Sequence, residues 1–172
     1  DGLVLDVKVG SGAFMKTLDQ ARALATTMVQ IGSLMGKQVT AVITDMNQPL
    51  GETVGNALEI EESVAVLQGG GPADVRELVL ELGAHMLRLG GVAADIPAGR
   101  ARIAQALADG SAFERFCAIT AAQGGSAAAL RDPRLLPQAR FSRPVFAAAP
   151  GVVQHVDTEQ VGVAAMTLGA GR

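Results

Sequence analysis

The sequence predicts an α/β protein, in which parallel strands alternate with helices. Two runs rich in β-branched and aliphatic residues, 2–9 and 38–44, have the nearly continuous apolar character of strands that helices cover on both faces. Between them, from residue 17 to about residue 31, apolar residues recur at helical spacing. A strand, a helix and a second strand in this order are typical of a parallel βαβ unit. A hydrophobic share of 49% in 172 residues is enough for one core of ordinary size.

Helices are expected after the second strand. The connecting loop, 45–56, is rich in turn formers and long for a connection. Helical spacing then resumes in four segments, 57–67, 74–89, 97–108 and 112–122. Pro72 blocks continuation of the first of these, and Asp74 is the expected cap of the second. We therefore expect residues 1–125 to form part of a mixed sheet-and-helix domain.

The composition changes after residue 125. Residues 126–140 are small, polar and punctuated by proline, which predicts a linker. Residues 143–156 predict two short strands around a Pro-Gly turn, and a helix is expected over 158–168. We expect residues 141–172 to be the beginning of a second, α+β domain.

The composition also excludes several classes of partner. A net charge of -3 and a pI near 5.3 leave no basic surface for nucleic acid, and the lack of tryptophan and tyrosine leaves few rings to stack on bases. No apolar stretch is long enough to cross a bilayer, and no signal peptide opens the sequence. We expect a cytoplasmic protein with neither nucleic-acid nor membrane partners. Because Asp1 leads directly into a strand, we also expect this sequence to be an excerpt of a longer chain.

A glycine-rich turn follows the first strand, in DVKVGSGAFMKT (6–17). A phosphate-binding loop needs glycine immediately before its lysine, and a dinucleotide fingerprint needs a third glycine; Met15 stands at both positions. Both nucleotide-binding hypotheses are therefore rejected. Thr17 and Gln20 have the spacing of a capping box, which predicts that a helix starts there. The turn is thus a βα corner, where ligands often sit.

Two charged side chains lie near this corner. Asp6 and Lys8 alternate with apolar residues, so they share one face at the carboxyl end of the first strand. Either they form an internal ion pair or a solvated strand end, or they take part in a site in which Lys8 binds substrate. Position and spacing leave both alternatives open.

Three acidic residues, Glu59, Glu61 and Glu62, crowd the start of the helix after the long loop. Negative side chains are favourable at a helix amino terminus, so a purely structural role explains them. The alternative is a cation site, in which loop carbonyls and one carboxylate supply oxygen ligands.

Several stretches together resemble one enzyme family. They are DGLVLDVKVGSGAFMKT, TDMNQPLGETVGNALEIEESV, GGGPADVRELVLELGAHML, AAQGG and the terminal VGVAAMTLGAGR. In this order and over nearly the whole chain, they resemble the pyrimidine-nucleoside phosphorylase and thymidine phosphorylase family.

The resemblance implies a homodimeric pentosyltransferase with a helical domain and an α/β domain. In that family, inorganic phosphate attacks the anomeric carbon of a pyrimidine nucleoside such as thymidine, uridine or deoxyuridine. The products are the free base and a (deoxy)ribose 1-phosphate. The family's phosphate loop and the residues that hold the base come before the position of Asp1. No catalytic residue is therefore expected within this segment, which should be inactive alone.

The resemblance also implies two sites within the segment. A potassium site would fall on Leu50, Thr53 and Glu62, with main-chain carbonyls from the first two; the family often has alanine at the Thr53 position. Phe14 resembles a residue that lines the base pocket, where an apolar ring packs against the pyrimidine. The alternative for Phe14 is a core ring beneath the turn.

Two rival hypotheses remain at this point. An anthranilate phosphoribosyltransferase-like enzyme would use a pyrophosphorylated ribose and magnesium, but its acidic diphosphate-binding signature is not seen in the sequence. A non-catalytic protein could instead keep the scaffold as a binding or assembly module.

Overall fold

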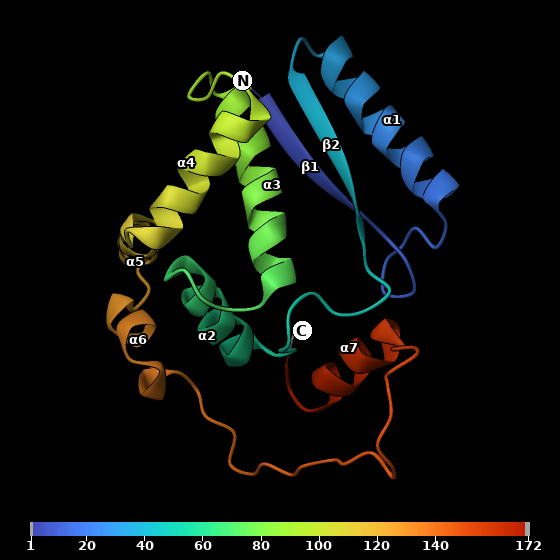
Figure 1. Cartoon of the computed structure of the whole chain (residues 1–172), viewed down its shortest axis with the longest axis vertical. Helices are drawn as coiled ribbons and strands as arrows, with labels where there is room; N and C mark the ends of the chain where they lie inside the picture. Colours follow the sequence, from blue (N-terminus) through green and yellow to red (C-terminus); the bar gives the residue numbers. More distant parts are fainter. Residues whose placement is uncertain (1, 171–172) are drawn as a thin grey trace.

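A computed structural model describes residues 2–170 and confirms the βαβ unit (Figure 1). Strand β1 (Gly2–Val9) is followed by helix α1 (Leu18–Leu34) and strand β2 (Gln38–Asp45). The two strands are parallel, and their register runs from Gly2 opposite Gln38 to Val9 opposite Asp45. Their carboxyl ends therefore lie side by side.

Helices cover both faces of this two-stranded sheet. Helix α1 packs on one face and helix α3 (Ala73–Leu89) on the other (Figure 1). A small core between α1 and the sheet contains Val7, Ala21 and Ala25. Thr17 caps α1 as expected: its side chain accepts from the Gln20 amide, and the Gln20 side chain accepts from the Thr17 amide in return.

The remaining predicted helices are also present. They are α2 (Asn56–Leu67), α3, α4 (Ile96–Ala108) and α5 (Ser111–Ala122), each within one residue of the expected bounds at either end. The cap predicted for α3 is wrong, because the N-cap residue is Pro72 and Asp74 already lies inside the helix. The Asp74 carboxylate instead accepts from the amide of Gly51, at 2.9 Å, and so ties α3 to the long loop.

The segment expected to be a linker is partly helical. It contains α6 (Ala127–Arg131) and a single 3₁₀ turn at Pro133–Leu135. Leu130 is buried in a second core with Val64 and Phe113. Arg131 forms two hydrogen bonds to Glu114, at 2.8 and 2.6 Å, which hold the pKa of the Glu114 carboxyl below its usual value. The helical part of this segment is therefore packed, while the division of the chain into domains stays a prediction.

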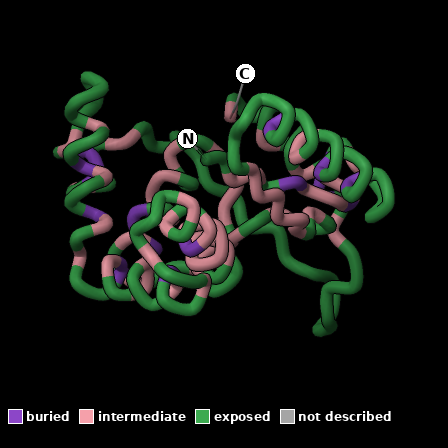
Figure 2. The backbone as a smooth tube through the Cα atoms, turned by 90° about the horizontal axis from the view of Figure 1, so that it is seen from above, coloured by how far each residue is buried: buried purple, intermediate pink, exposed green. Residues whose placement is uncertain are grey.

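The two strands predicted within 143–156 are absent. This segment is irregular and makes no strand pairing within the described part of the chain, so β-branched composition alone did not produce a strand. Its residues are almost all exposed, as the long green stretch of the tube shows (Figure 2). The expected last helix is present as α7 (Thr158–Thr167), capped by Asp157. None of the helices among residues 2–170 is both long and apolar enough to span a bilayer.

Candidate functional site

Three segments meet at the carboxyl edge of the sheet. They are the turn between β1 and α1, the loop between β2 and α2, and the start of α7 (Figure 1). In open α/β sheets, ligands bind outside the carboxyl ends of the strands. Two cavities lie here, and Met46 lines both.

The first cavity, which we call the corner cavity, has a volume of about 510 Å³. It is lined by residues of β1, the glycine turn (residues 10–17), α1, the β2–α2 loop and α7, namely Leu5, Asp6, Val7, Lys8, Gly12, Ala13, Phe14, Met15, Lys16, Leu24, Met28, Met46 and Glu159. Phe14, Asp6 and Lys8 all line this cavity. The Phe14 side chain is 98% exposed, so this ring is not a core ring beneath the turn. The exposed ring lies at the cavity, where it can pack against a ligand.

Asp6 and Lys8 form an ion pair and line the corner cavity at the same time. Lys8 Nζ lies 2.7 Å from Asp6 Oδ2 and donates to Thr44 Oγ1 at 2.9 Å. The Thr44 hydroxyl donates in turn to Asp6 Oδ1. A lysine ammonium carries three N–H donors, and these two contacts use two of them. Within residues 2–170 the third has no partner, so it remains for a ligand acceptor.

The glycine turn does not cradle a phosphate. Gly10, Ser11 and Gly12 donate their amides to Met15 O, Asn47 Oδ1 and Met46 O, at 3.0 to 3.1 Å. A phosphate-binding loop needs such amides free to point at the anion. The Gly10 amide instead closes the turn on itself, and the amides of Ser11 and Gly12 bind the β2–α2 loop. These bonds fix the position of the turn at the sheet edge.

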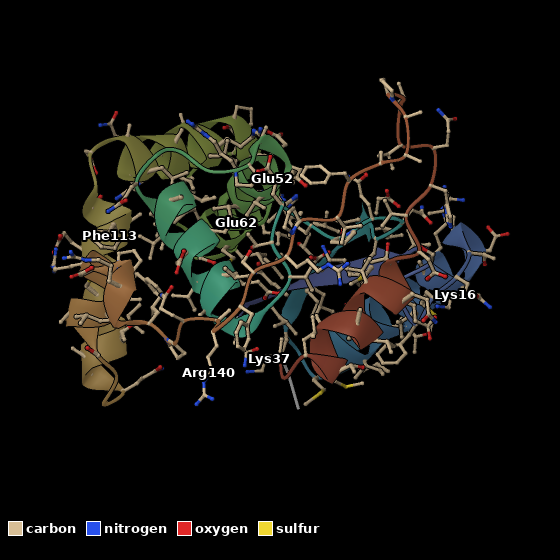
Figure 3. All side chains as sticks on the ribbon, turned by 90° about the horizontal axis from the view of Figure 1, so that it is seen from below. Lys16, Lys37, Glu52, Glu62, Phe113 and Arg140 are labelled. Atoms are coloured by element: carbon tan, nitrogen blue, oxygen red, sulfur yellow. The ribbon has the colours of Figure 1, made fainter. Side chains whose placement is uncertain are left out.

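The second cavity, which we call the loop cavity, has a volume of about 320 Å³. The three residues of the expected potassium site, Leu50, Thr53 and Glu62, all line it. Glu62 Oε1 accepts from the amide of Glu52 at 2.9 Å, so this carboxylate braces the loop from α2 (Figure 3). Thr53 Oγ1 is buried and has no hydrogen-bond partner within the described residues. Glu59 also lines the cavity, and its carboxylate accepts from the Gly55 amide at 3.1 Å.

The chemistry of this donor set suits a cation. An orphaned buried hydroxyl oxygen costs free energy unless a donor or a positive charge satisfies it. A hard cation prefers carboxylate, carbonyl and hydroxyl oxygens, and residues that carry such groups line the loop cavity. Glu59 reaches the amide at the helix start, as its structural explanation requires, whereas Glu62 reaches back to the loop. The two glutamates thus have different roles.

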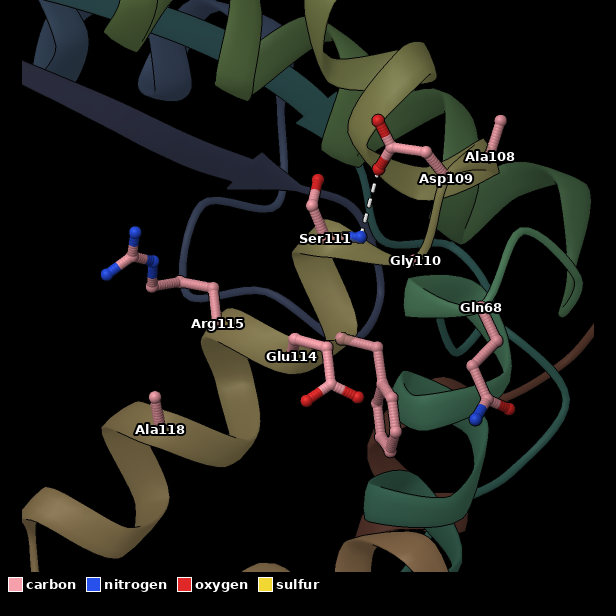
Figure 4. Close-up of a pocket in the computed structure, with 9 residues that line it drawn as sticks. Gln68, Ala108, Asp109, Gly110, Ser111, Glu114, Arg115 and Ala118 are labelled. Atoms are coloured by element: carbon pink, nitrogen blue, oxygen red, sulfur yellow. Dashed lines mark hydrogen bonds between the residues drawn. The ribbon is translucent and has the colours of Figure 1, made fainter.

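A third, open cavity of about 750 Å³ lies at the start of α5 (Figure 4). Its polar side chains include Asp109, Glu114 and Arg115. Asp109 accepts from the Ser111 amide at 2.9 Å, and hydrogen bonds from Ser111 hold the pKa of the Asp109 carboxyl below its usual value. Glu114 is already paired with Arg131. The polar groups of this cavity therefore mainly serve the helix start and the packing of α6.

Sequence reasoning missed the contribution of α7 to both cavities. Glu159 lines the corner cavity, while Thr158 lines the loop cavity. These residues reach the site across about 140 positions of sequence, and their contacts follow no local period. Neither composition nor residue spacing predicts that Thr158 and Glu159 line these cavities.

Comparison with known proteins gives consistent matches over the whole chain. The chain is 48% identical over 172 residues to a pyrimidine-nucleoside phosphorylase of Geobacillus stearothermophilus. It is 47% identical to the enzyme of the same name from Bacillus subtilis. The identity to the enzyme of the same name from Staphylococcus aureus is 46%. Each match covers all of this chain and 40% of the relative, so the chain spans less than half the length of these curated proteins. The family resemblance is confirmed.

Residues 1–113, about two thirds of the chain, match the profile described as the a/b domain of the glycosyl transferase family. That range includes the sheet, the glycine turn, the long loop and helices α1 to α4. It therefore holds most of both cavities. On this match, the chain belongs to the glycosyl transferase family and carries its α/β domain.

Proposed function

We propose that this chain is the α/β portion of a pyrimidine-nucleoside phosphorylase. In the reaction, phosphate attacks the anomeric carbon of the nucleoside, and the products are the free base and a pentose 1-phosphate. The observation that carries the proposal is the 46–48% identity of the whole chain to three relatives of that name. Because the chain spans 40% of their length, we assign the reaction to the full-length protein that carries this segment.

The corner cavity suits the pyrimidine part of the substrate. The exposed Phe14 ring offers an apolar face to a planar base, and the remaining N–H of Lys8 can donate to a base carbonyl. Cleavage of the glycosidic bond puts negative charge on the leaving base, and a lysine close to it stabilises that charge. Asp6 and Thr44 orient the ammonium for this contact. Pentosyl transfer also needs water excluded, which closure of a second domain over the cavity provides.

The loop cavity suits a potassium ion. Glu62 would supply a carboxylate oxygen, and Leu50 and Thr53 would supply main-chain carbonyls. The buried hydroxyl of Thr53 adds an oxygen that has no hydrogen-bond partner among the described residues. A bound cation supplies positive charge beside the substrate-binding loops. We further propose that the full-length protein is a homodimer and acts in the cytoplasm in pyrimidine salvage.

The function is tested by release of base from nucleoside, followed by ultraviolet absorbance. We expect the full-length protein to release uracil from uridine or thymine from thymidine only when inorganic phosphate is present. The relative rates on the two nucleosides separate a broad pyrimidine enzyme from a thymidine-specific one. Base release at the same rate without phosphate would contradict the proposal, because it would indicate hydrolysis.

The assignment of Phe14 predicts a selective loss of nucleoside binding. Phe14→Ala removes the ring at the corner cavity, and we expect KM for the nucleoside to rise about tenfold while KM for phosphate stays constant. Phe141→Ala is the matched control, since Phe141 is 91% exposed and lies on the irregular segment before α7. Steady-state kinetics measure both constants. Equal changes in the two variants would remove Phe14 from the base site.

A further inference from the structure

We propose that the amino-terminal turn of α7 is a positioning element for the pyrimidine site. In this inference, Thr158 and Glu159 hold the glycine turn, residues 10–17, so that Phe14 stays at the corner cavity. The inference rests on the proposed function, because it assigns a role in binding of that substrate. It concerns a segment outside the range that matches the family's α/β domain.

Side chains of α7 contact the glycine turn at several points. Lys16 Nζ lies 3.2 Å from Glu159 Oε2 and donates to Ser11 O at 2.8 Å, so this one lysine joins α7 to the turn. Ser11 Oγ also lies 3.5 Å from Thr158 Oγ1. Phe14 is located between Ser11 and Lys16 in the sequence. The contacts with α7 therefore flank the residue whose ring faces the cavity.

The steric contact between Thr158 and Gly12 is the most important of these. The side chains of Lys16 and Glu159 are 52% and 63% exposed, and an ion pair in that setting contributes little. Thr158 by contrast is 6% exposed and packs directly on Gly12. A Cβ atom at Gly12 would lie 2.5 Å from Thr158 Cγ2 and 2.8 Å from Thr158 Cβ. The Thr158 side chain can pack this closely on the turn only because residue 12 is glycine.

The same turn of α7 also connects the two cavities. Thr158 lines the loop cavity and Glu159 lines the corner cavity, while Met46 lines both. Met46 O accepts from the Gly12 amide at 3.0 Å, so the glycine turn, Met46 and α7 form one packed junction. A shift of α7 must therefore move the turn that carries Phe14. Misplacement of a substrate-contacting group by about 1 Å can change reactivity by about two orders of magnitude.

The test uses the full-length protein and five variants. Gly12→Ala places a methyl group against Thr158 and forces α7 and the turn apart. We expect KM for the nucleoside to rise about tenfold, with KM for phosphate unchanged. The double variant Gly12→Ala/Thr158→Gly removes the colliding atoms and should recover most of the nucleoside affinity. Gly151→Ala is the matched control, because a Cβ at Gly151 meets no atom within 4 Å.

A second pair of variants avoids the collision, in case Gly12→Ala does not fold. Thr158→Val keeps the branched shape that contacts Gly12, so KM for the nucleoside should stay near that of the wild type. Thr158→Gly removes the contact and should raise the same constant. Equal values in the two variants, or parallel changes in both KM values, would overturn the inference while base release by the wild type still supports the proposed function. A wild-type protein with no phosphate-dependent base release would overturn both.

Discussion

Replacing Gly10 with alanine is expected to lower the free energy of unfolding by about 2–4 kcal/mol, the combined cost of backbone strain and overpacking. Gly10 has a φ of +135°, a conformation that L side chains rarely adopt. A Cβ there would lie 2.7 Å from both Asn47 N and Met46 C. These are backbone atoms, so no side-chain rotation relieves the collision. The glycine turn would have to separate from the β2–α2 loop.

The control for this variant is Gly36→Ala. Gly36 also has a positive φ, +68°, but a Cβ at this position meets no atom within 4 Å. Its substitution should therefore lower the free energy of unfolding only by the cost of backbone strain, about 1 kcal/mol. Chemical denaturation of the two full-length variants measures the difference. Equal losses would show that the close contact between the two loops does not exist in solution.

Replacing Glu62 with glutamine is expected to abolish the stabilisation of the protein by potassium. The substitution keeps the size and one acceptor oxygen but removes the negative charge beside Leu50 and Thr53 in the loop cavity. An ion that binds only the folded state, at about 100 times its Kd, stabilises that state by about 2.7 kcal/mol. We expect this gain in the wild type and its loss in the variant. Melting temperatures in potassium chloride and in choline chloride, at equal ionic strength, provide the measurement.

Glu61→Gln is the matched control for the charge. Glu61 lies on the same helix, next to Glu62, but is not among the residues that line the loop cavity. Its variant should keep the full response to potassium. If Glu62→Gln responds to potassium like the wild type, Glu62 serves only to brace the loop through the Glu52 amide.

Local patterns were sufficient to predict the regular elements in the first two thirds of the chain. The capping box of Thr17 and Gln20 fixed the start of α1 because both hydrogen bonds join residues three positions apart. The β-branched runs became strands because a partner strand and covering helices were available. Local patterns predicted the structure less well where it depends on contacts between segments distant in sequence. Residues 143–156 have strand composition but pair with no strand within the described residues.

The prediction for Asp74 was wrong for a related reason. Asp74 has the residue type of a cap, but Pro72 already occupies that position, and the Asp74 carboxylate binds Gly51, 23 residues away. The packing of α6 was missed in the same way. Small residues interrupted by prolines are typical of linkers, yet Leu130 is buried in the same core as Phe113. Neither contact is visible in the spacing of nearby residues.

The candidate site shows the same division. Spacing placed Asp6 and Lys8 on one face of β1, and the structure joins them at the corner cavity. The resemblance named Leu50, Thr53 and Glu62, and the structure places all three on the loop cavity. The roles of Thr158 and Met46 could not be predicted, because they arise where segments distant in sequence pack against one another.

The most direct test of the central proposal is to follow phosphorus during the reaction. Phosphorus NMR of the full-length protein with uridine and inorganic phosphate should show a pentose 1-phosphate signal that grows in step with free uracil. The inorganic phosphate signal should fall by the same amount. Release of uracil with no loss of inorganic phosphate would contradict the assignment of this chain to a phosphorylase.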